Sequence, residues 1–274
     1  MINQPSPDVS SRQNPRFKAA LALRDARERR ARGHILVDGA REIGRALDMG
    51  VPLLEAWVAT ERVRSLAAQA LLPRVASSGE IIETTPELLA RLAYGKRDEG
   101  IVAVLETPPS DLDRLAQTLP ERPLIAVVEQ VEKPGNLGAL LRSADGAGVD
   151  AVIVADPVSD IWNPNAIRAS LGTIFSLPLA TCSSAEALAF LRTHGIAVLT
   201  ARVGAKIDYD AADLTAPVAL VVGAETSGLT EAWSGEGTTP VSIPMLGLAD
   251  SLNVSASAAV LFYEARRQRR AANR

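Results

Sequence analysis

Short, almost wholly apolar runs in the second half of the chain most constrain its fold. They include LIAVVEQ at 124–130, DAVIVAD at 150–156 and PVALVVGAE at 217–225, and helical patterns separate them. A strand with one face in water alternates polar and apolar residues, whereas a strand covered on both faces is apolar throughout. Apolar strands that alternate with helices therefore predict an α/β domain with a mostly parallel sheet between layers of helices.

Shorter elements alternate in the first half of the chain as well. Apolar runs such as HILVDG at 34–39 and GIVAVLE at 100–106 are separated by helical patterns, and another helical pattern covers 16–33. The stretch TPPSDLDRLAQTLPERP at 107–123 contains four prolines, which is typical of a linker. We predict four segments: a disordered N-terminus over 1–15, a small α/β domain over 16–106, a linker over 107–122 and a second domain over 123–274.

Composition narrows the classes of protein to which the chain could belong. Of its 274 residues, 47% are hydrophobic and 22% are charged, as in ordinary globular proteins. No apolar run approaches the roughly 18–20 residues needed to cross a bilayer, and the N-terminus lacks the apolar core of a secretion signal. The single cysteine, Cys182, cannot form an internal disulfide. We therefore expect a cytoplasmic protein without membrane contact.

Metal catalysis has little support in the sequence. His34 and His194 are the only histidines and lie far apart in the chain. No cluster has the spacing of metal ligands. We therefore expect no metal site and interpret both histidines as structural.

Arginine is concentrated near both ends of the chain, although the net charge is −3. The two clusters lie in RFKAALALRDARERRARG at 16–33 and in EARRQRRAANR at 264–274. A guanidinium group suits phosphate because its planar fork donates two parallel hydrogen bonds. Each cluster could be an RNA-binding face or only a solvated helix face, and the sequence leaves both interpretations open.

Three loops that follow apolar runs combine glycine with polar or charged residues. They are KPGNLGALLRSADGAG at 133–148, VVGAETSGLT at 221–230 and IPMLGLADSLNVSASA at 243–258. In a parallel sheet, ligands bind beyond the carboxyl ends of the strands, where such loops lie. Gly135 and Gly138 give only G-x-x-G, which does not match the dinucleotide fingerprint, and the Walker phosphate loop is absent.

Together, these three segments resemble the three sequence motifs of the SpoU/TrmH class of SPOUT methyltransferases. The matching stretches are PGNLGALLRSAD, GAETSGL, and I-P-M followed by S-L-N-V-S, in this order from about Leu124 onward. The residues before the linker resemble the L30e-like RNA-binding domain of the ribosomal-RNA members. The chain is also similar in general to the avilamycin- and thiostrepton-resistance methyltransferases.

The resemblance implies both a fold and an activity. The fold is α/β, with an L30e-like N-terminal domain and a C-terminal SPOUT domain whose mostly parallel sheet contains a trefoil knot. The activity is methylation of a ribose 2′-hydroxyl in RNA, expected to be 23S ribosomal RNA, with S-adenosylmethionine as the cofactor and a homodimer as the working form. Alternatives are a transfer-RNA 2′-O-methyltransferase and a non-catalytic RNA-binding or ribosome-assembly protein.

Carried over by position, the resemblance also implies the site residues. Five residues would line the adenosine site, largely through backbone groups: Thr200, Ala201, Gly223, Ile243 and Leu252. Five others would form the catalytic set: Asn136, Arg142, Glu225, Ser251 and Asn253. Arg168 would contact an RNA phosphate. Arg142 is central, either as a general base or as an electrostatic clamp, and the clamp is favoured because arginine is effectively never deprotonated in proteins.

Each of these residues also has a purely structural interpretation. Asn136 could cap the helix after the glycine turn, and Arg142 and Arg168 could be surface charges on helices. Ser251 could cap the last helix, with Asn253 in its first turn. The order of the three motifs favours catalysis. Leu171 stands where thiostrepton-type enzymes have an arginine, so the RNA and the nucleotide that are methylated stay open.

Overall fold

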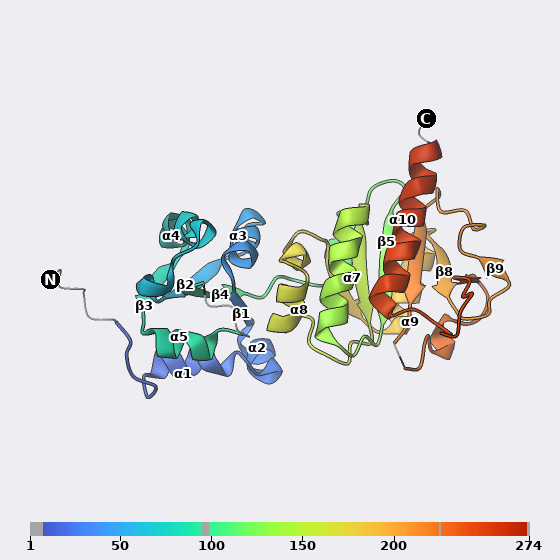
Figure 1. Cartoon of the computed structure of the whole chain (residues 1–274). Helices are drawn as coiled ribbons and strands as arrows, with labels where there is room; N and C mark the ends of the chain where they lie inside the picture. Colours follow the sequence, from blue (N-terminus) through green and yellow to red (C-terminus); the bar gives the residue numbers. More distant parts are fainter. Residues whose placement is uncertain (1–7, 95–98, 225, 273–274) are drawn as a thin grey trace. The chain divides into compact units, whose positions relative to one another are not determined.

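The computed structural model describes residues 8–94, 99–224 and 226–272, and its chain forms two compact units (Figure 1). The first unit comprises Met1–Pro108 together with Trp162–Ser176, and the second comprises Pro109–Ile161 together with Leu177–Arg274. A short internal segment of the chain therefore packs with the first unit, although the sequence around it belongs to the second.

A mixed four-stranded sheet forms the centre of the first unit. Its order is β1-β4-β2-β3. The pairs β1–β4 and β4–β2 are antiparallel and the pair β2–β3 is parallel. The strands are β1 (His34–Asp38), β2 (Leu53–Val58), β3 (Glu80–Glu83) and β4 (Ile101–Glu106).

Helices cover both faces of this sheet (Figure 1). One face carries α1 and α5, and the other carries α3 and α4. The predicted helical stretch at 16–33 is divided into α1 and α2, because the Asp25 carboxylate accepts a hydrogen bond from the Arg27 amide and starts a new helix. The helices are α1 (Pro15–Ala22), α2 (Ala26–Arg32), α3 (Ala40–Asp48), α4 (Leu66–Ser78) and α5 (Pro86–Leu92), with a 3₁₀ turn, η1, at Thr60–Arg62.

The core of the first unit lies between its sheet and the pair α1 and α5. Trp57 of β2 is completely buried and meets Phe17 of α1 edge to face, with 6.1 Å between ring centroids. The described part of the predicted disordered N-terminus is ordered here. Val9 is buried, and its amide donates to the Glu83 carbonyl at 3.1 Å. This apolar side chain and the strand-like pairing hold residues 8–14 against the sheet.

The internal segment Trp162–Ser176 contributes α8 (Pro164–Ala169) and the 3₁₀ turn η2 (Thr173–Phe175) to the first unit. The α8 helix starts as the sequence predicts, with the Asn163 side chain accepting from the Asn165 amide and Pro164 at the first position. Trp162 and Phe175 stack at 6.0 Å within the segment.

Two arginines fix this segment to the rest of the first unit. Arg168 of α8 pairs with Asp38 at 2.5 Å and also donates to the Tyr94 carbonyl. The side chains of this ion pair are 23% and 6% exposed. Arg45 of α3 donates to the Leu171 carbonyl at 2.9 Å from an exposed position. Burial raises the pKa of Asp38 although the Tyr94 amide and the Arg168 guanidinium oppose the shift.

The second unit is built on a seven-stranded sheet in which every described pairing is parallel. Its order is β7-β6-β5-β10-β8-β11-β9. This confirms the mostly parallel sheet predicted from the apolar runs. The strands are β5 (Leu124–Glu129), β6 (Ala151–Ala155), β7 (Leu179–Cys182), β8 (Ala197–Ala201), β9 (Ile207–Asp208), β10 (Val218–Val222) and β11 (Thr238–Ser242).

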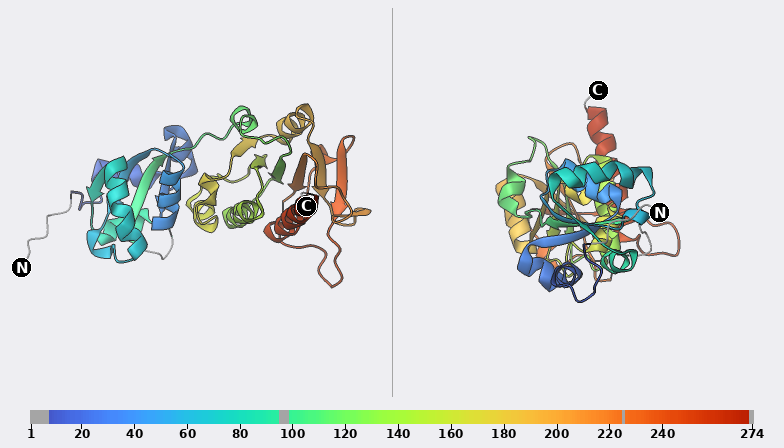
Figure 2. Two further views of the ribbon diagram at one scale, coloured as in Figure 1. Left: turned by 90° about the horizontal axis from the view of Figure 1, so that it is seen from above. Right: turned by 90° about the vertical axis from the view of Figure 1, so that its left-hand side faces the viewer.

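Helices α7 and α10 pack together on one face of this sheet, and α6 and α9 lie on the other (Figure 2). Ser183 begins α9 with a capping box, in which Glu186 reaches back to the Ser183 amide. The trefoil knot and the L30e-like character of the first unit stay predictions. The helices are α6 (Leu112–Ala116), α7 (Pro134–Ala147), α9 (Ser184–Thr193) and α10 (Val254–Ala272), with a 3₁₀ turn, η3, at Glu231–Trp233.

Of the helices in the described part of the chain, none combines the length and the apolar character needed to span a membrane. Within the same residues, no three side chains of His, Cys, Asp or Glu form a cluster that could hold a metal ion.

We predict that Arg168→Ala destabilises the first unit by about 3 kcal/mol, because it leaves the carboxylate of Asp38 buried without its cation. The loss should be larger at about pH 7.5 than at about pH 4. Because the pKa of Asp38 is raised, a larger share of its carboxyl is protonated at the lower pH, where it needs no cation, and the penalty grows as the carboxyl ionises with rising pH. Urea unfolding at both pH values measures the difference.

Arg45→Ala is the matched control for this substitution. It removes a single exposed hydrogen bond to the same segment, so its cost should stay below about 1 kcal/mol. Equal losses of unfolding free energy in the two variants would show that the Arg168–Asp38 ion pair stabilises the unit no more than one exposed hydrogen bond does.

Candidate functional site

A cavity of about 470 Å³ lies at the carboxyl ends of three neighbouring strands of the second sheet. This is the edge of a parallel sheet where ligands bind. The loops after β8, β10 and β11 and the start of α10 form its walls. The described residues that line it are Ala201, Arg202, Val203, Val222, Gly223, Ala224, Thr226, Ser227, Gly228, Leu229, Ile243, Met245, Asp250, Ser251, Leu252, Val254 and Ser257.

Four of the five predicted cofactor residues line this cavity, together with one predicted catalytic residue. The four are Ala201, Gly223, Ile243 and Leu252, and the catalytic residue is Ser251. Thr200 lies one residue away on β8 and is completely buried instead. Its hydroxyl oxygen has no hydrogen-bond partner among the described residues. The structure therefore brings together residues that are up to 51 positions apart in the sequence, from 201 to 252.

Gly223 allows the loop after β10 to fold tightly back on itself. A Cβ atom at this position would lie 2.3 Å from the carbonyl carbon of Gly228 and 2.4 Å from the Leu229 nitrogen. Real Cβ atoms do not approach backbone so closely, so only glycine fits. Gly228 itself has φ +66° and donates its amide to the Ala224 carbonyl at 3.1 Å. The wall of the cavity formed by 223–229 therefore depends on glycine at both ends of the turn.

A buried carboxylate holds the far end of this loop. Glu129 is the last residue of β5 and is completely buried. Its Oε2 accepts from the Thr230 amide at 2.8 Å, and its Oε1 accepts from the Thr230 hydroxyl at 2.6 Å and the Ser184 hydroxyl at 2.8 Å. Trp233 in turn donates its indole N–H to the Ser184 hydroxyl at 3.2 Å. A buried charge needs such donors, and three neutral groups supply them here.

Arg202 binds the same stretch of backbone with a positive charge, through the carbonyl oxygens. Its guanidinium donates to the carbonyls of Leu229 at 3.3 Å and Thr230 at 3.1 Å, and to the Ser234 hydroxyl at 2.9 Å. The carboxylate of Glu129 thus accepts a hydrogen bond from the Thr230 amide, and the guanidinium of Arg202 donates one to the Thr230 carbonyl. We name this arrangement the Glu129–Arg202 clamp. It fixes the peptide groups directly beside the cavity wall.

Neither member of the Glu129–Arg202 clamp is identified from the sequence. A carboxylate at the end of an apolar run, as in LIAVVE at 124–129, is the signal that could have identified Glu129. Arg202 carries no comparable signal, because nothing in the sequence tells which carbonyls its side chain meets.

The residue just before the first motif loop contacts the second motif loop through an exposed hydrogen bond. The Thr226 hydroxyl donates to the Glu132 carboxylate at 2.9 Å. Between β5 and α7 the chain turns at Gln130, whose φ of +51° is unusual for a residue with a side chain. Such backbone is found at functional sites more often than elsewhere.

Asn136 and Arg142 both lie on α7, and neither is among the described residues that line the cavity. Asn136 is half-buried in the first turn, where its backbone N–H donates to the Lys133 carbonyl at 2.9 Å. Arg142 is exposed, and among the described residues its side chain has no hydrogen bond or ion pair. It shares the outer face of α7 with Gly135 and Gly146, which are also exposed and lie seven residues before it and four after it.

Asn253 lies at the start of the last helix, where its side chain makes hydrogen bonds. Its side-chain oxygen accepts from the Ser255 amide at 3.0 Å and from the Ser255 hydroxyl at 2.7 Å, so it caps the start of α10. Ser251 and Leu252 precede it in the loop and are exposed. Glu225 lies outside the described residues.

Arg168 lies in the first unit, and its guanidinium is engaged there by Asp38 and Tyr94. Its contact with an RNA phosphate stays a prediction. Leu171, the residue that departs from the thiostrepton-type pattern, has φ +57° and offers its carbonyl to Arg45.

Comparison with known proteins identifies the family of the chain. The family model described as SpoU rRNA Methylase family matches residues 123–263, and the MRM3-like substrate binding domain matches residues 14–103. The 23S rRNA (uridine(2479)-2′-O)-methyltransferase of Streptomyces viridochromogenes is 36% identical over 269 residues, which are 95% of this chain and 92% of that protein.

Solved structures show the same likeness. The SpoU methyltransferase AviRb from Streptomyces viridochromogenes, in complex with the cofactor AdoMet, has a TM-score of 0.87 at 34% identity and covers 94% of this chain and 98% of its own. An RNA 2′-O ribose methyltransferase has a TM-score of 0.82 at 39% identity and covers 95% and 98% of the two chains. These matches run over both units. The chain therefore belongs to the SpoU rRNA methylase family.

Proposed function

We propose that this protein transfers the methyl group of S-adenosylmethionine to a ribose 2′-hydroxyl of 23S ribosomal RNA. The observation that carries this proposal is the cavity at the carboxyl ends of β8, β10 and β11, which gathers predicted cofactor residues from three separate segments. The 23S rRNA enzyme that matches almost the whole chain supports the choice of RNA.

The cavity suits S-adenosylmethionine in size and in chemistry. Its volume of about 470 Å³ lies within the range of small-molecule sites. Its lining is mixed, with apolar side chains such as Leu229 and Ile243, polar ones such as Ser251, and backbone of the glycine-bounded turn at 223–228. When bound, the cofactor supplies a methyl group that a positively charged sulfur already activates. The family relation to a methyltransferase solved with AdoMet adds to this support.

The protein's own residues would hold the cofactor mainly through backbone. Gly223, Ile243 and Leu252 would lie against the adenosine, with Ala201 at the edge of the cavity. The Glu129–Arg202 clamp would keep the second-motif loop in the shape that the cofactor needs. Preorganised backbone of this kind lowers the cost of binding.

The reaction needs a positioned ribose oxygen and a route for its proton. Arg142 has a guanidinium that no described residue occupies, and we assign it to the phosphate and the developing alkoxide of the target nucleotide. It acts as a clamp, since arginine is not deprotonated in proteins; the hydroxyl proton passes to phosphate or water. Asn136 would orient the ribose.

The remaining predicted residues keep supporting functions in this proposal. Ser251 would sit near the methyl group, since it lines the cavity, and Asn253 would set the start of α10 beside it. Glu225 would hold loop amides or an arginine. The 2′-hydroxyl restricts the substrate to RNA, because DNA lacks it.

We also propose that the protein works as a homodimer in the cytoplasm. Leu246 and Leu248, in the loop between β11 and α10, are 100% and 105% exposed. Two fully exposed leucines in one loop would be covered if a second copy packed there.

Methyl transfer to RNA is tested directly with the purified protein, tritiated S-adenosylmethionine and 23S ribosomal RNA. We expect one or a few ribose positions to become methylated, and mapping of 2′-O-methyl groups identifies them. If the protein binds the donor but transfers methyl to no RNA, it is an RNA-binding or ribosome-assembly protein instead.

Arg142→Ala should lower the rate of methyl transfer at least about 100-fold, because it removes charge stabilisation present only as the alkoxide develops. The dissociation constant for S-adenosylmethionine should stay within a few-fold of wild type, because Arg142 does not line the cavity. Calorimetry and single-turnover kinetics separate the two effects.

Arg192→Ala serves as the control for Arg142, since Arg192 lies on α9, which covers the opposite face of the sheet. This control should retain its rate. A large loss of donor affinity in Arg142→Ala would mean that Arg142 belongs to the cofactor cavity and not to the RNA side.

Glu129→Gln should raise the dissociation constant for S-adenosylmethionine about tenfold, because its NH2 group replaces one of the two acceptor oxygens that bind the Thr230 amide and the hydroxyls of Thr230 and Ser184. The exposed Glu132→Gln, which alters one hydrogen bond to Thr226, should change it less than about threefold. Isothermal titration of both variants decides this, with circular dichroism to show that each is folded. An unchanged affinity in Glu129→Gln would show that the Glu129–Arg202 clamp does not contribute to cofactor binding.

A further inference from the structure

Two exposed arginines and a half-buried tyrosine meet at the end of α5 in the first unit. We propose that Arg24, Arg91 and Tyr94 form a contact surface for a single-stranded stretch of the RNA substrate, where one base stacks and a neighbouring phosphate binds the arginines. We name these three residues the Tyr94 platform. This inference rests on the proposed function, because it assumes that RNA is the substrate.

The guanidinium of Arg24 is held in one orientation although the side chain is exposed. Arg24 lies in the turn between α1 and α2, and its Cζ is 5.0 Å from the centre of the Tyr94 ring. Its Nη1 donates to the carbonyls of Arg91 at 2.7 Å and Ala93 at 3.0 Å, so it also caps the end of α5. Capping uses Nη1 alone, and Nε and Nη2 have no hydrogen bond within the described residues. The guanidinium plane is therefore preorganised, which lowers the cost of binding a ligand.

Tyr94 is fixed at both its backbone and its hydroxyl group. Its amide donates to the Asp38 carboxylate at 2.9 Å, and its carbonyl accepts from Arg168. The hydroxyl accepts from Nδ2 of Asn165 at 3.2 Å. Asn165 lies on α8, in the internal segment that packs with the first unit. The ring that supports Arg24 is thus held by residues far from it in the sequence.

The positive charge of the Tyr94 platform is not neutralised by any described residue. Arg91 lies in the last turn of α5 and is exposed, and its own carbonyl accepts from Arg24, so two cations meet at one turn. No carboxylate of the described chain lies within 4.0 Å of either guanidinium. The nearby acidic side chains are engaged, since Asp25 caps α2 and Glu28 pairs with Arg32 at 2.8 Å. Two such cations attract an anion with several acceptor oxygens, such as a phosphate.

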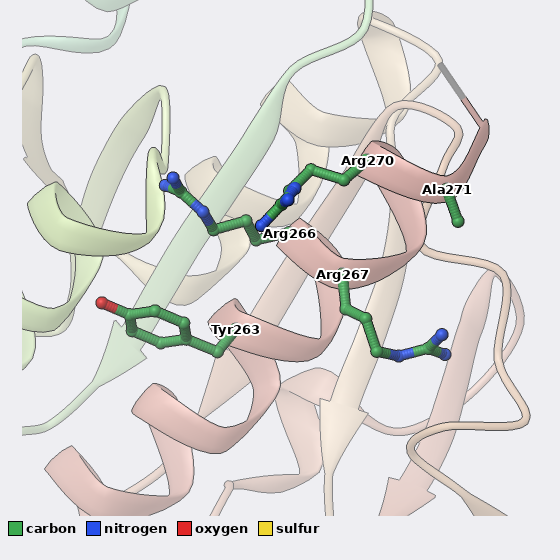
Figure 3. Close-up of a pocket in the computed structure, with 5 residues that line it drawn as sticks. All are labelled: Tyr263, Arg266, Arg267, Arg270 and Ala271. Carbon is green, nitrogen blue, oxygen red and sulfur yellow. The ribbon is translucent and has the colours of Figure 1, made fainter. Parts of the chain in front are cut away.

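The arginines of α10 are a less suitable surface for RNA. Arg266, Arg267 and Arg270 line a surface hollow of about 530 Å³ (Figure 3). Arg267 is already paired with Glu264 at 2.7 Å. The loop with two fully exposed leucines leads directly into α10, so a second copy that covers this loop would also cover the start of the helix. The first unit, by contrast, matches a substrate binding domain over residues 14–103.

An unpaired nucleotide fits the Tyr94 platform better than a duplex does. A base of single-stranded RNA can stack on an aromatic ring or on the plane of a guanidinium. Nε and Nη2 of Arg24, together with Arg91, can then donate to the phosphate beside that base. A duplex keeps its bases stacked on one another and offers only its phosphates. We therefore expect the platform to contribute more to the binding of single strands.

Stacking is tested with Tyr94→Leu in the full-length protein. Fluorescence anisotropy gives the dissociation constants for a single-stranded fragment of 23S ribosomal RNA and for the same fragment paired with its complement. Tyr94→Leu should weaken binding of the single strand about fivefold or more and binding of the duplex less than about twofold. Tyr94→Phe, which keeps the ring, should bind both RNAs within about twofold of wild type. Circular dichroism shows that the variants are folded.

Charge is tested with Arg91→Gln, whose side chain has no hydrogen bond or ion pair with a described residue, so the fold does not depend on it. If Arg91 neutralises one phosphate, the slope of log K against log salt should become shallower by about 0.7–0.9. Arg32→Gln is the matched control, because it removes the same formal charge from a side chain that is paired with Glu28. It should leave the slope at the wild-type value.

Unchanged single-strand affinity in Tyr94→Leu, or an unchanged slope in Arg91→Gln, overturns the proposal and leaves Arg24 as a helix cap. Equal losses on the single strand and the duplex also overturn it, because stacking would then have no part in binding. Failure of the proposed function is a separate result: the wild-type protein would methylate no RNA, whereas affinities and slopes are measured from binding alone.

Discussion

The buried carboxylate of Glu129 is the interaction on which the arrangement of the second unit most depends. It lies at the end of β5 and binds the Thr230 amide beyond the second-motif loop and the Ser184 hydroxyl at the start of α9. Three segments that are distant in the sequence therefore meet at one charge. Such a charge is tolerated in the interior only while all its donors are in place. The loop that forms the cavity wall is thus held by a network that has little freedom to rearrange.

The internal segment at 162–176 shows that the boundary between two units need not follow the order of the chain. Arg168 and the stacked pair of Trp162 and Phe175 give this segment its own contacts within the first unit. A truncation that removes only residues before Thr107 would leave the apolar side chains of Ile167 and Ile174 without their partners. Experiments on the second unit alone therefore need to replace this segment as well.

The sequence predicts the parallel sheet from local signals, whereas the cavity residues follow from the resemblance to the methyltransferase family. Apolar runs give strands with two covered faces, and Gly223 leaves the space that the tight turn after β10 needs. Long-range side-chain contacts carry no such signal. Arg168 looks like a surface charge in sequence, but it is an ion-pair partner of a residue 130 positions away. The packing of residues 8–14 was not predictable for the same reason, since it depends on one apolar side chain, Val9, meeting a distant strand.

The number of basic residues overstates the surface that can attract RNA. Arg269 donates to four backbone carbonyls, and its burial lowers the pKa of the guanidinium. Arg16 is shared between two glutamates, and Arg202 is part of the clamp. The C-terminal arginine cluster therefore divides into residues that hold the fold and residues that face solvent. In a protein with a net charge of −3, long-range attraction of RNA is weak. Affinity must come from a few guanidinium groups that are not engaged within the fold.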